Sequence, residues 1–178
     1  HASGTTFARG RTNVTCTAYD AAGNEASTSQ SNNTVTLNDK TGPTVTYSPA
    51  HNATGTAADR NITITFNDAA RKIDDSALTD SNVDALITLK TTNASGSDIG
   101  FDATIDTDKK VITINPSSDF SSEQVVYVAI GATVEDSNGN AITASSATFT
   151  VVNTTATSVT FSPADGAKAI AVSSNVTL

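Results

Sequence analysis

The 178-residue chain has no methionine, no tryptophan and only one cysteine, and it carries few charges. Its ten lysines and arginines are scattered among 18 acidic residues, which gives a net charge of −8. Nucleic acids and anionic membrane surfaces attract basic stripes, so this composition argues against both as partners. No apolar run approaches the roughly 20 residues that a membrane-spanning helix needs. We therefore expect no nucleic-acid partner and no membrane span in this segment.

The residues that usually carry catalysis are also scarce. Cys16 has no second cysteine in the chain, so it is either a buried strand residue or has its partner outside this segment. The two histidines, His1 and His51, form no Ser/His/Asp or Cys/His arrangement that the sequence reveals. We therefore expect no catalytic residues and no enzyme activity.

Serine and threonine are abundant, with 51 of the 178 residues, and 31 of these are threonine. Threonine is β-branched and suits strands, while its hydroxyl keeps the outer face of a sheet hydrated. An apolar content of 37% is enough for a β-sandwich in which each sheet buries one face. The composition thus favours an all-β fold.

Strand-like runs between residues 44 and 153 predict a complete antiparallel Ig-like β-sandwich, because they are short, are joined by Gly, Asn and Asp turns, and include no long helix. The run at residues 124–130 is apolar on both faces and should be central in its sheet. Residues 74–82 should form one short helical turn, capped by Asp75 or Ser76, with Leu78 pointing inward. The predicted strands are residues 44–48, 61–66, 85–90, 101–106, 111–115, 124–130 and 146–152.

An internal repeat divides the chain into units. Residues 44–64 return as residues 158–178, an offset of 114, with nine of 21 positions identical. Such a repeat indicates tandem units of one architecture. We predict the C-terminal part of an Ig-like unit at residues 1–39, a linker at 40–43, a complete domain at 44–153, and the first strands of a following unit at 154–178. The two end units are therefore incomplete.

Short motifs support this division. The middle unit contains Ser48-Pro-Ala-His-Asn-Ala53, Thr63-Ile-Thr-Phe66 and Asp136-Ser-Asn-Gly-Asn140, and in these it resembles a bacterial Ig-like domain. The second copy carries Ser162-Pro-Ala-Asp-Gly-Ala167, and from residue 157 it resembles the same family. Residues 1–39 resemble the second half of a hyalin-repeat (HYR-like) domain, through Ser3-Gly-Thr-Thr-Phe7, Val14-Thr-Cys-Thr-Ala18 and Asp20-Ala-Ala-Gly-Asn24. Both resemblances imply tandem modules of secreted, cell-surface proteins without catalytic residues.

One segment offers oxygen ligands for a metal. Asp136, Asn138 and Asn140 alternate like the start of an EF-hand loop. The pattern then fails, because Ala141 stands where the loop needs glycine and Ala147 where it needs glutamate. We interpret the segment as a turn, with calcium as the weaker alternative, and we expect no other cofactor.

Seven Asn-x-Ser/Thr sequons are present. A chain of this composition contains roughly four by chance, so incidental sequons are the stronger interpretation and N-glycosylation the alternative. Asn93 and Asn52 are the best candidates because we expect them in loops. The other sequons are at Asn13, Asn32, Asn61, Asn153 and Asn175.

We expect a structural segment of an extracellular tandem-repeat surface protein, such as a stalk, adhesin or fibre, whose partners are neighbouring Ig-like units. One alternative is a subunit of a surface filament that assembles by strand exchange between identical chains. Another is a module that binds a glycan or a surface receptor protein, although the chain has few aromatic residues to form a platform. The residues of the donated strand would be Ser158, Val159, Phe161, Val176 and Leu178.

Overall fold

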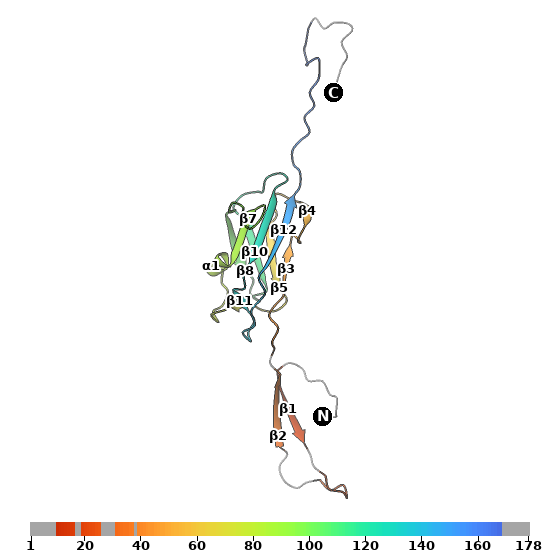
Figure 1. The fold of residues 1–178 in the computed structure, drawn as a ribbon, viewed down its shortest axis with the longest axis vertical. Helices are drawn as coiled ribbons and strands as arrows, with labels where there is room; N and C mark the ends of the chain where they lie inside the picture. Colours follow the sequence, from red (N-terminus) through yellow and green to blue (C-terminus); the bar gives the residue numbers. More distant parts are fainter. Residues whose placement is uncertain (1–9, 17–18, 26–30, 38, 169–178) are drawn as a thin grey trace.

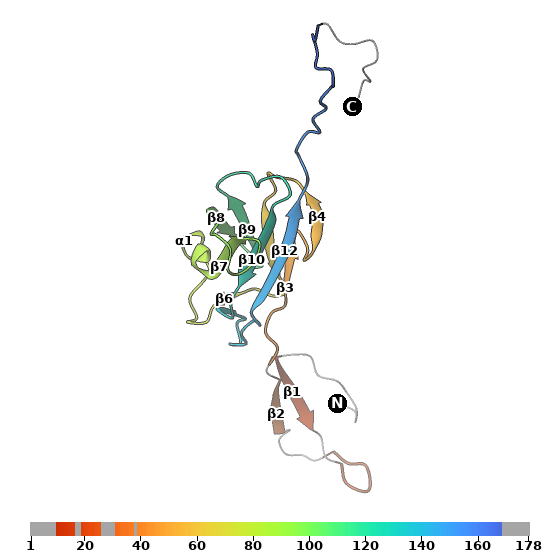
Figure 2. The same cartoon turned by 45° about the horizontal axis from the view of Figure 1, so that its top comes forward.

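The computed structural model describes residues 10–16, 19–25, 31–37 and 39–168. Between residues 45 and 151 two four-stranded sheets pack face to face, as Figures 1 and 2 show from two directions. This all-β sandwich confirms the predicted fold class. A separate hairpin on the N-terminal side is formed by β1 (Gly10–Cys16) and β2 (Ser31–Leu37), which pair antiparallel. No described helix is long and apolar enough to cross a membrane.

The first sheet has the strand order β4-β12-β10-β7. As predicted, the doubly apolar strand β10 is central, between β12 and β7. Its pairs with both neighbours are antiparallel, but β4 and β12 run parallel. The strands are β4 (Ala53–Thr56), β7 (Ile87–Thr91), β10 (Val125–Ile130) and β12 (Ser145–Val151).

The second sheet has the order β3-β5-β9-β8, and all its neighbours are antiparallel. β8 and β9 form the predicted hairpin, whose turn is closed by Asp106: its carboxylate accepts hydrogen bonds from the N–H groups of Lys110 and Val111. The strands are β3 (Val45–Ser48), β5 (Ile62–Phe66), β8 (Phe101–Ile105) and β9 (Val111–Pro116).

Alternate side chains of both sheets meet in one core. This alternation follows from the period of two in a strand, which sends every second side chain to the same face. Phe120 and Phe149 lie edge to face with ring centroids 5.7 Å apart. The largest fully buried side chains are Phe66, Phe149, Ile62, Ile64, Leu78, Leu89, Ile112, Ile114, Ile130, Val83, Val126 and Val128.

The predicted helical turn lies later in the chain than expected. Helix α1 (Asp80–Val83) follows an N-cap at Thr79, whose N–H is bonded by the Asn82 side chain, and η1 (Asp84–Leu86) continues it. Asp75 instead has φ 65° and belongs to a tight turn, so the prediction that Asp75 or Ser76 caps the helix was wrong. Leu78 is buried, as predicted.

Three outer features complete the sandwich. The short strands β6 (Arg71–Lys72) and β11 (Val134–Glu135) pair antiparallel beside the main sheets. The outer edge of β8 is covered by α1 and η1, since Asp80 and Asp84 accept the N–H groups of Ile105 and Ala103. The outer edge of β7 is covered by an isolated bridge between Lys90 and Asp98.

Candidate functional site

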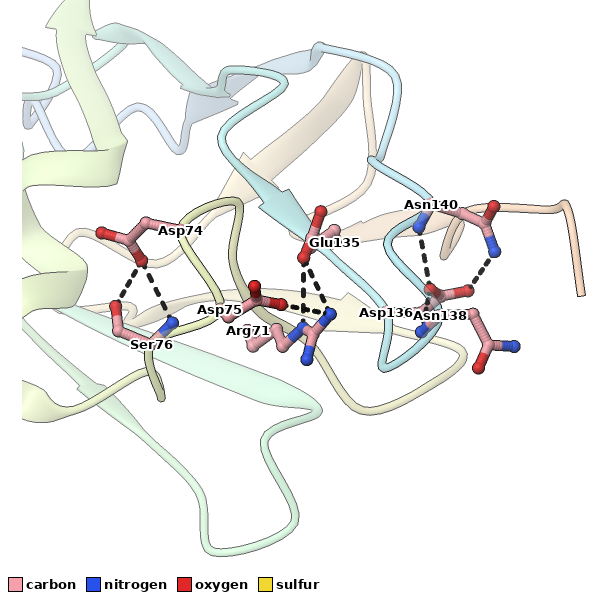
Figure 3. Close-up of polar contacts among 8 residues, drawn as sticks. All are labelled: Arg71, Asp74, Asp75, Ser76, Glu135, Asp136, Asn138 and Asn140. Carbon is pink, nitrogen blue, oxygen red and sulfur yellow. Dashed lines mark hydrogen bonds and ion pairs between the residues drawn. The ribbon is translucent and has the colours of Figure 1, made fainter.

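The turn at residues 136–140, between β11 and β12, is organised by the carboxylate of its first residue (Figure 3). Asp136 Oδ1 accepts the N–H groups of Asn138 at 2.8 Å and Asn140 at 2.9 Å, and Oδ2 accepts Asn140 Nδ2 at 2.8 Å. Gly139 has φ 82°, a backbone conformation that glycine adopts without steric cost. Asp136 itself is buried. The turn is therefore a closed unit of hydrogen bonds.

The same turn holds the chain that leads into the sandwich. Asn140 Nδ2 also donates to the main-chain carbonyl of Asp39 at 3.1 Å. Gly42 lies so close to the chain leaving the turn that a Cβ built on it would be 2.1 Å from the carbonyl oxygen of Ala141. We call residues 39–43 the N-terminal linker. It lies against residues 136–141 and beside a surface hollow of about 480 Å³.

Burial and hydrogen bonding act in opposite directions on Asp136. Burial alone raises the pKa of its carboxyl group, but the bonds from Asn140 and Asn138 and the nearby charge of Arg71 hold that pKa below the ordinary value. The group is therefore a carboxylate at neutral pH. The carboxylate already accepts three hydrogen bonds from described residues, two on Oδ1 and one on Oδ2, so a calcium ion would find only one free lone pair, on Oδ2. The calcium alternative for Asp136, Asn138 and Asn140 stays a prediction.

An ion cluster lies beside the turn, as Figure 3 shows. The Arg71 guanidinium on β6 contacts Glu135 Oε1 on β11 through Nε at 3.1 Å and through its terminal nitrogen at 3.0 Å, and it also reaches Asp75 at 2.6 Å. Glu135 is buried, so its charge needs this partner. The pair fixes β6 against β11 directly before the turn.

The segment at residues 20–24, between β1 and β2, forms the same turn. Asp20 Oδ1 accepts the N–H groups of Ala22 and Asn24, each at 2.9 Å, and Oδ2 accepts Asn24 Nδ2 at 2.9 Å. Gly23 has φ 84°. The side-chain bonds to Asn24 are the main cause that lowers the pKa of Asp20. The shared sequence Asp-x-x-Gly-Asn thus encodes one structure at two places.

At the opposite end of the sandwich, Ser122 forms hydrogen bonds to the segment that follows β12. The Ser122 hydroxyl donates to Asn153 Oδ1 at 3.2 Å, and its oxygen accepts Thr154 N–H at 2.9 Å and the Thr155 hydroxyl at 3.3 Å. Glu123 N–H also donates to the Val152 carbonyl at 3.4 Å. We call residues 153–157 the C-terminal linker.

The two linkers share a local structure. Asp39 Oδ1 accepts Thr41 N–H at 3.0 Å, and Asn153 Oδ1 accepts Thr155 N–H at 2.8 Å. These are Asx turns, in which a short polar side chain bonds the backbone two residues on. Asp39 and Asn153 are 114 positions apart, the offset of the sequence repeat. The repeat therefore extends five residues further upstream in structure than the aligned sequence indicated.

The sequence predicted the turn at residues 136–140, but it predicted neither of the hydrogen bonds that attach the two linkers to the sandwich. Nothing in the local pattern marks Asn140 as the partner of Asp39 or Ser122 as the partner of Asn153. The only available signal was the offset of 114, which aligns Asp39 with Asn153.

Two of the predicted glycosylation sites, Asn52 and Asn93, lie in exposed turns, as expected. Asn61 and Asn153 are also exposed. Asn13 and Asn32 are placed in β1 and β2, but their side chains lie outside what the structure describes, as does Asn175 altogether. N-glycosylation at these positions stays a prediction.

The predicted donor segment is described as far as residue 168. Residues 158–161 belong to no described strand, and the side chains of Val159 and Phe161 are 59% and 55% exposed. Ser158 is exposed as well, while Val176 and Leu178 lie outside the described residues. Whether this segment pairs with another chain stays a prediction.

Over the described part of the chain, no group of three His, Cys, Asp or Glu residues could hold a metal ion. His51 has a backbone partner instead: its Nδ1 accepts the N–H of Thr148, on β12, at 3.1 Å. His51 thus belongs to the edge of the first sheet.

Comparison with solved structures gives distant likenesses. The chain is similar to CopC from Methylosinus trichosporium OB3b, with 14% identity, 65% of this chain and 99% of that chain covered, and a TM-score of 0.43. It is also similar to the LD transpeptidase LdtMt1 in complex with imipenem, with 17% identity, 62% and 40% covered, and a TM-score of 0.36. No curated protein matches. At these values neither likeness bears on function.

Comparison with protein families gives a clear match. The sequence model described as bacterial Ig-like domain matches residues 39–151. These limits begin at Asp39 in the N-terminal linker and end at Val151, the last residue of β12. The match covers more than half of the chain, and the chain therefore belongs to the bacterial Ig-like domain family.

Proposed function

We propose that this chain is a structural spacer of an extracellular tandem-repeat protein, in which Ig-like units follow one another in series. Bacterial Ig-like domains typically occur in surface-exposed bacterial proteins, which supports the location. One observation carries the proposal: the chain enters and leaves the sandwich at opposite ends and is hydrogen-bonded to it at both. A spacer needs this arrangement, and catalysis does not.

Strand β12 spans the distance between the two attachment points. Asn140 lies just before this strand and Asn153 just after it, and its seven residues cover about 23 Å at the usual rise per residue. In Figure 1 the incoming and outgoing chains lie at opposite ends of the sandwich. Tension on the protein would therefore pass along the long axis of the domain.

We further propose that both flanking segments belong to neighbouring Ig-like units. The shared turn at residues 20–24 supports an HYR-like unit at residues 1–39. The Asx turn at Asn153 supports a second bacterial Ig-like unit that begins near residue 157. The partners of the sandwich are then its neighbours in the same chain.

The spacer proposal requires that the backbone of both linkers is as rigid as the strands of the sandwich. We expect ¹⁵N relaxation of the full chain to give order parameters of about 0.85 for residues 39–43 and 153–155, as in the strands. Asn140→Ala should release the N-terminal linker and Ser122→Ala the C-terminal linker. Order parameters below about 0.6 in both linkers of the unmodified chain would overturn the proposal.

Matched controls are available at neighbouring positions. The side chains of Asn138 and Ser121 bond to no described residue, although their backbone N–H groups are bonded. Asn138→Ala and Ser121→Ala should therefore leave the linkers as rigid as before. If these controls loosen the linkers equally, the effect is not due to the bonds at Asn140 and Ser122.

Strand exchange between chains is the second candidate function. It is favoured by two observations on the described residues: β3 is an outer strand with no strand on its other side, and Val159 and Phe161 are exposed on a segment that belongs to no described strand. That segment repeats the β3 sequence, Val-Thr-Tyr-Ser against Val-Thr-Phe-Ser. An open edge of this kind is a template for an added strand.

Sedimentation and electron microscopy of the purified chain test this candidate. Strand exchange predicts concentration-dependent oligomers or filaments that are lost in the double variant V159K/F161K. Thr160→Lys, on the same exposed segment, is the control that should retain them. A monomer at all concentrations would remove this candidate and leave the spacer proposal intact.

A module that binds a glycan or a receptor protein has less support. Tyr19 and Phe161 are the exposed aromatic side chains among the described residues. Tyr19 precedes the sandwich in the sequence and Phe161 follows it, so the two form no common platform. Binding of a glycan or a receptor protein stays a prediction from the sequence. A glycan array that shows no binding would rule out the glycan-binding alternative.

A further inference from the structure

The one parallel pair among the described strands joins the beginning of the sandwich to its end. β4 follows β3 closely, while β12 is the last strand, and the two are paired as Phe149↔Ala53 and Val151↔Thr56. All other described strand pairs are antiparallel. In Figure 2 the arrows of β4 and β12 point the same way, toward the C-terminal end of the sandwich.

This pairing determines how tension acts. The N-terminal linker pulls on β3 and, through the short connection after it, on the start of β4. The C-terminal linker pulls on the end of β12, in the opposite direction. Two parallel strands pulled from opposite ends slide past each other lengthwise. All bonds between them then carry the load together, whereas strands that are peeled apart break their bonds one after another.

The bonds across this pair are well placed for such a load. At one end Asn52 N–H donates to the Thr148 carbonyl at 2.7 Å, and at the other Val152 N–H donates to the Thr56 carbonyl at 2.8 Å. His51 Nδ1 adds a third bond by accepting Thr148 N–H at 3.1 Å. Beneath them Phe149 and Val151 are buried in the core, so the inner face of the pair is closed to water.

We propose that the β4–β12 pair, extended by the His51 side chain, is a mechanical clamp that keeps the domain folded when the chain is under tension. This inference rests on the proposed spacer function, because only a domain in series with others experiences tension through its two ends. Beyond the spacer function, the proposal identifies the β4–β12 pair as the place where the domain resists tension and where forced unfolding begins.

The second copy of the repeat keeps the chemistry of the third bond. Asp165 takes the place of His51. A carboxylate, like a neutral imidazole nitrogen, accepts a hydrogen bond from a backbone N–H. A requirement for an acceptor at this position explains why two such different residues alternate there.

Single-molecule force spectroscopy of the full chain tests the clamp by changing the direction of pulling. Cys16→Ser removes the native thiol, and handles at the two chain ends load the pair lengthwise. Handles at Ala57→Cys and Asn153→Cys, just past the same end of both strands, peel the pair apart. Unfolding of residues 45–151 is recognised by a length gain of about 350 Å through the chain ends.

We expect the lengthwise unfolding force to exceed the peeling force by about twofold or more, because forced unfolding reports the barrier that the loaded bonds set. His51→Ala should lower the lengthwise force, and His51→Asp, the residue of the second copy, should retain it. Equal forces in the two directions would overturn the clamp. That result leaves the linker order parameters untouched, so it is distinguishable from failure of the spacer proposal.

Discussion

The side-chain amide of Asn140 donates a hydrogen bond of 3.1 Å to the main-chain carbonyl of Asp39, 101 positions earlier in the chain. The same amide nitrogen donates to Asp136. One side chain therefore both closes the turn before the last strand and fixes the linker before the first strand. The orientation of the incoming chain is determined by a turn that the sequence places at the far end of the domain.

Gly42 makes this contact sensitive to a single methyl group. In Gly42→Ala the new Cβ would lie 2.1 Å from the Ala141 carbonyl oxygen, so the linker has to move away. We expect a loss of about 1–3 kcal/mol in the free energy of unfolding, the usual cost of overpacking. Urea unfolding followed by circular dichroism measures it.

The matched control for this change is Gly131→Ala. A Cβ there meets only the Thr133 methyl group at 3.5 Å, an ordinary contact. It should leave stability within about 0.5 kcal/mol of the unmodified chain. If both variants lose the same amount, the contact with Ala141 is not the cause.

Asp136 should make the stability of the sandwich depend on pH. A carboxyl group whose pKa is lower in the folded than in the unfolded chain adds stability above its unfolded pKa, about 3.9, and loses it as the pH falls through the folded value. We expect the free energy of unfolding to fall below about pH 4. Asp136→Asn should be less stable at pH 7 but lose less on acidification. Equal losses in both proteins between pH 7 and pH 3 would contradict this.

The closed turn also predicts the response to calcium. Both carboxylate oxygens of Asp136 accept hydrogen bonds within the turn, so a cation gains little by replacing them. We expect the thermal midpoint of the full chain to be the same in EDTA and in millimolar calcium. A rise with calcium concentration, as for a ligand that binds only the folded state, would show that a calcium site exists.

Much of the sandwich could be predicted because its signals are local. Alternating Ile62, Ile64 and Phe66 mark a strand with one buried face, and the double apolar face of residues 124–130 marks a central strand. The Asp-x-x-Gly-Asn turns could be predicted for the same reason, since the aspartate, glycine and asparagine that build them lie within five consecutive residues.

Features that depend on distant contacts could not be predicted. β4 consists of Ala53-Thr-Gly-Thr56, with a glycine and no apolar alternation, and it is a strand because β12 lies beside it. Helix α1 begins after a local cap at Thr79, but its place against β8 depends on the distant bonds of Asp80 and Asp84 to that strand. The bonds from Asn140 to Asp39 and from Ser122 to Asn153 also join residues far apart in the sequence. Most of the candidate site therefore could not be predicted from the sequence.

The aspartates of the helical segment should protect the edge of β8. Asp84 accepts the N–H of buried Ala103 at 2.8 Å, and Asp80 accepts that of Ile105 at 2.9 Å. Asp84→Ala should cost about 1–2 kcal/mol, since a partly buried donor is left without a partner. The double variant D80A/D84A should also associate with increasing concentration, because its strand edge is open.

Asp102→Ala is the control for this edge. Asp102 lies on β8 itself, is exposed, and its side chain bonds to no described residue. Removing it takes away one negative charge, against two in D80A/D84A, without uncovering any N–H group. Sedimentation of D102A should show the same monomer as the unmodified chain, and association of D102A would mean that charge, not edge covering, keeps the chains apart.

Tyr47 provides the last prediction, since its hydroxyl is buried without a hydrogen-bond partner among the described residues. Burial raises the pKa of this phenol, and the nearby Ser145 hydroxyl and Ile130 backbone offset that rise only in part. An unpaired buried hydroxyl costs free energy, and the second copy carries Phe161 at this position. Tyr47→Phe should therefore leave the free energy of unfolding unchanged or raise it by up to about 1 kcal/mol. A loss of that size instead would mean that the hydroxyl is bonded to Ser145 or Ile130, and Ser145→Ala, which removes only the first of these partners, would tell them apart.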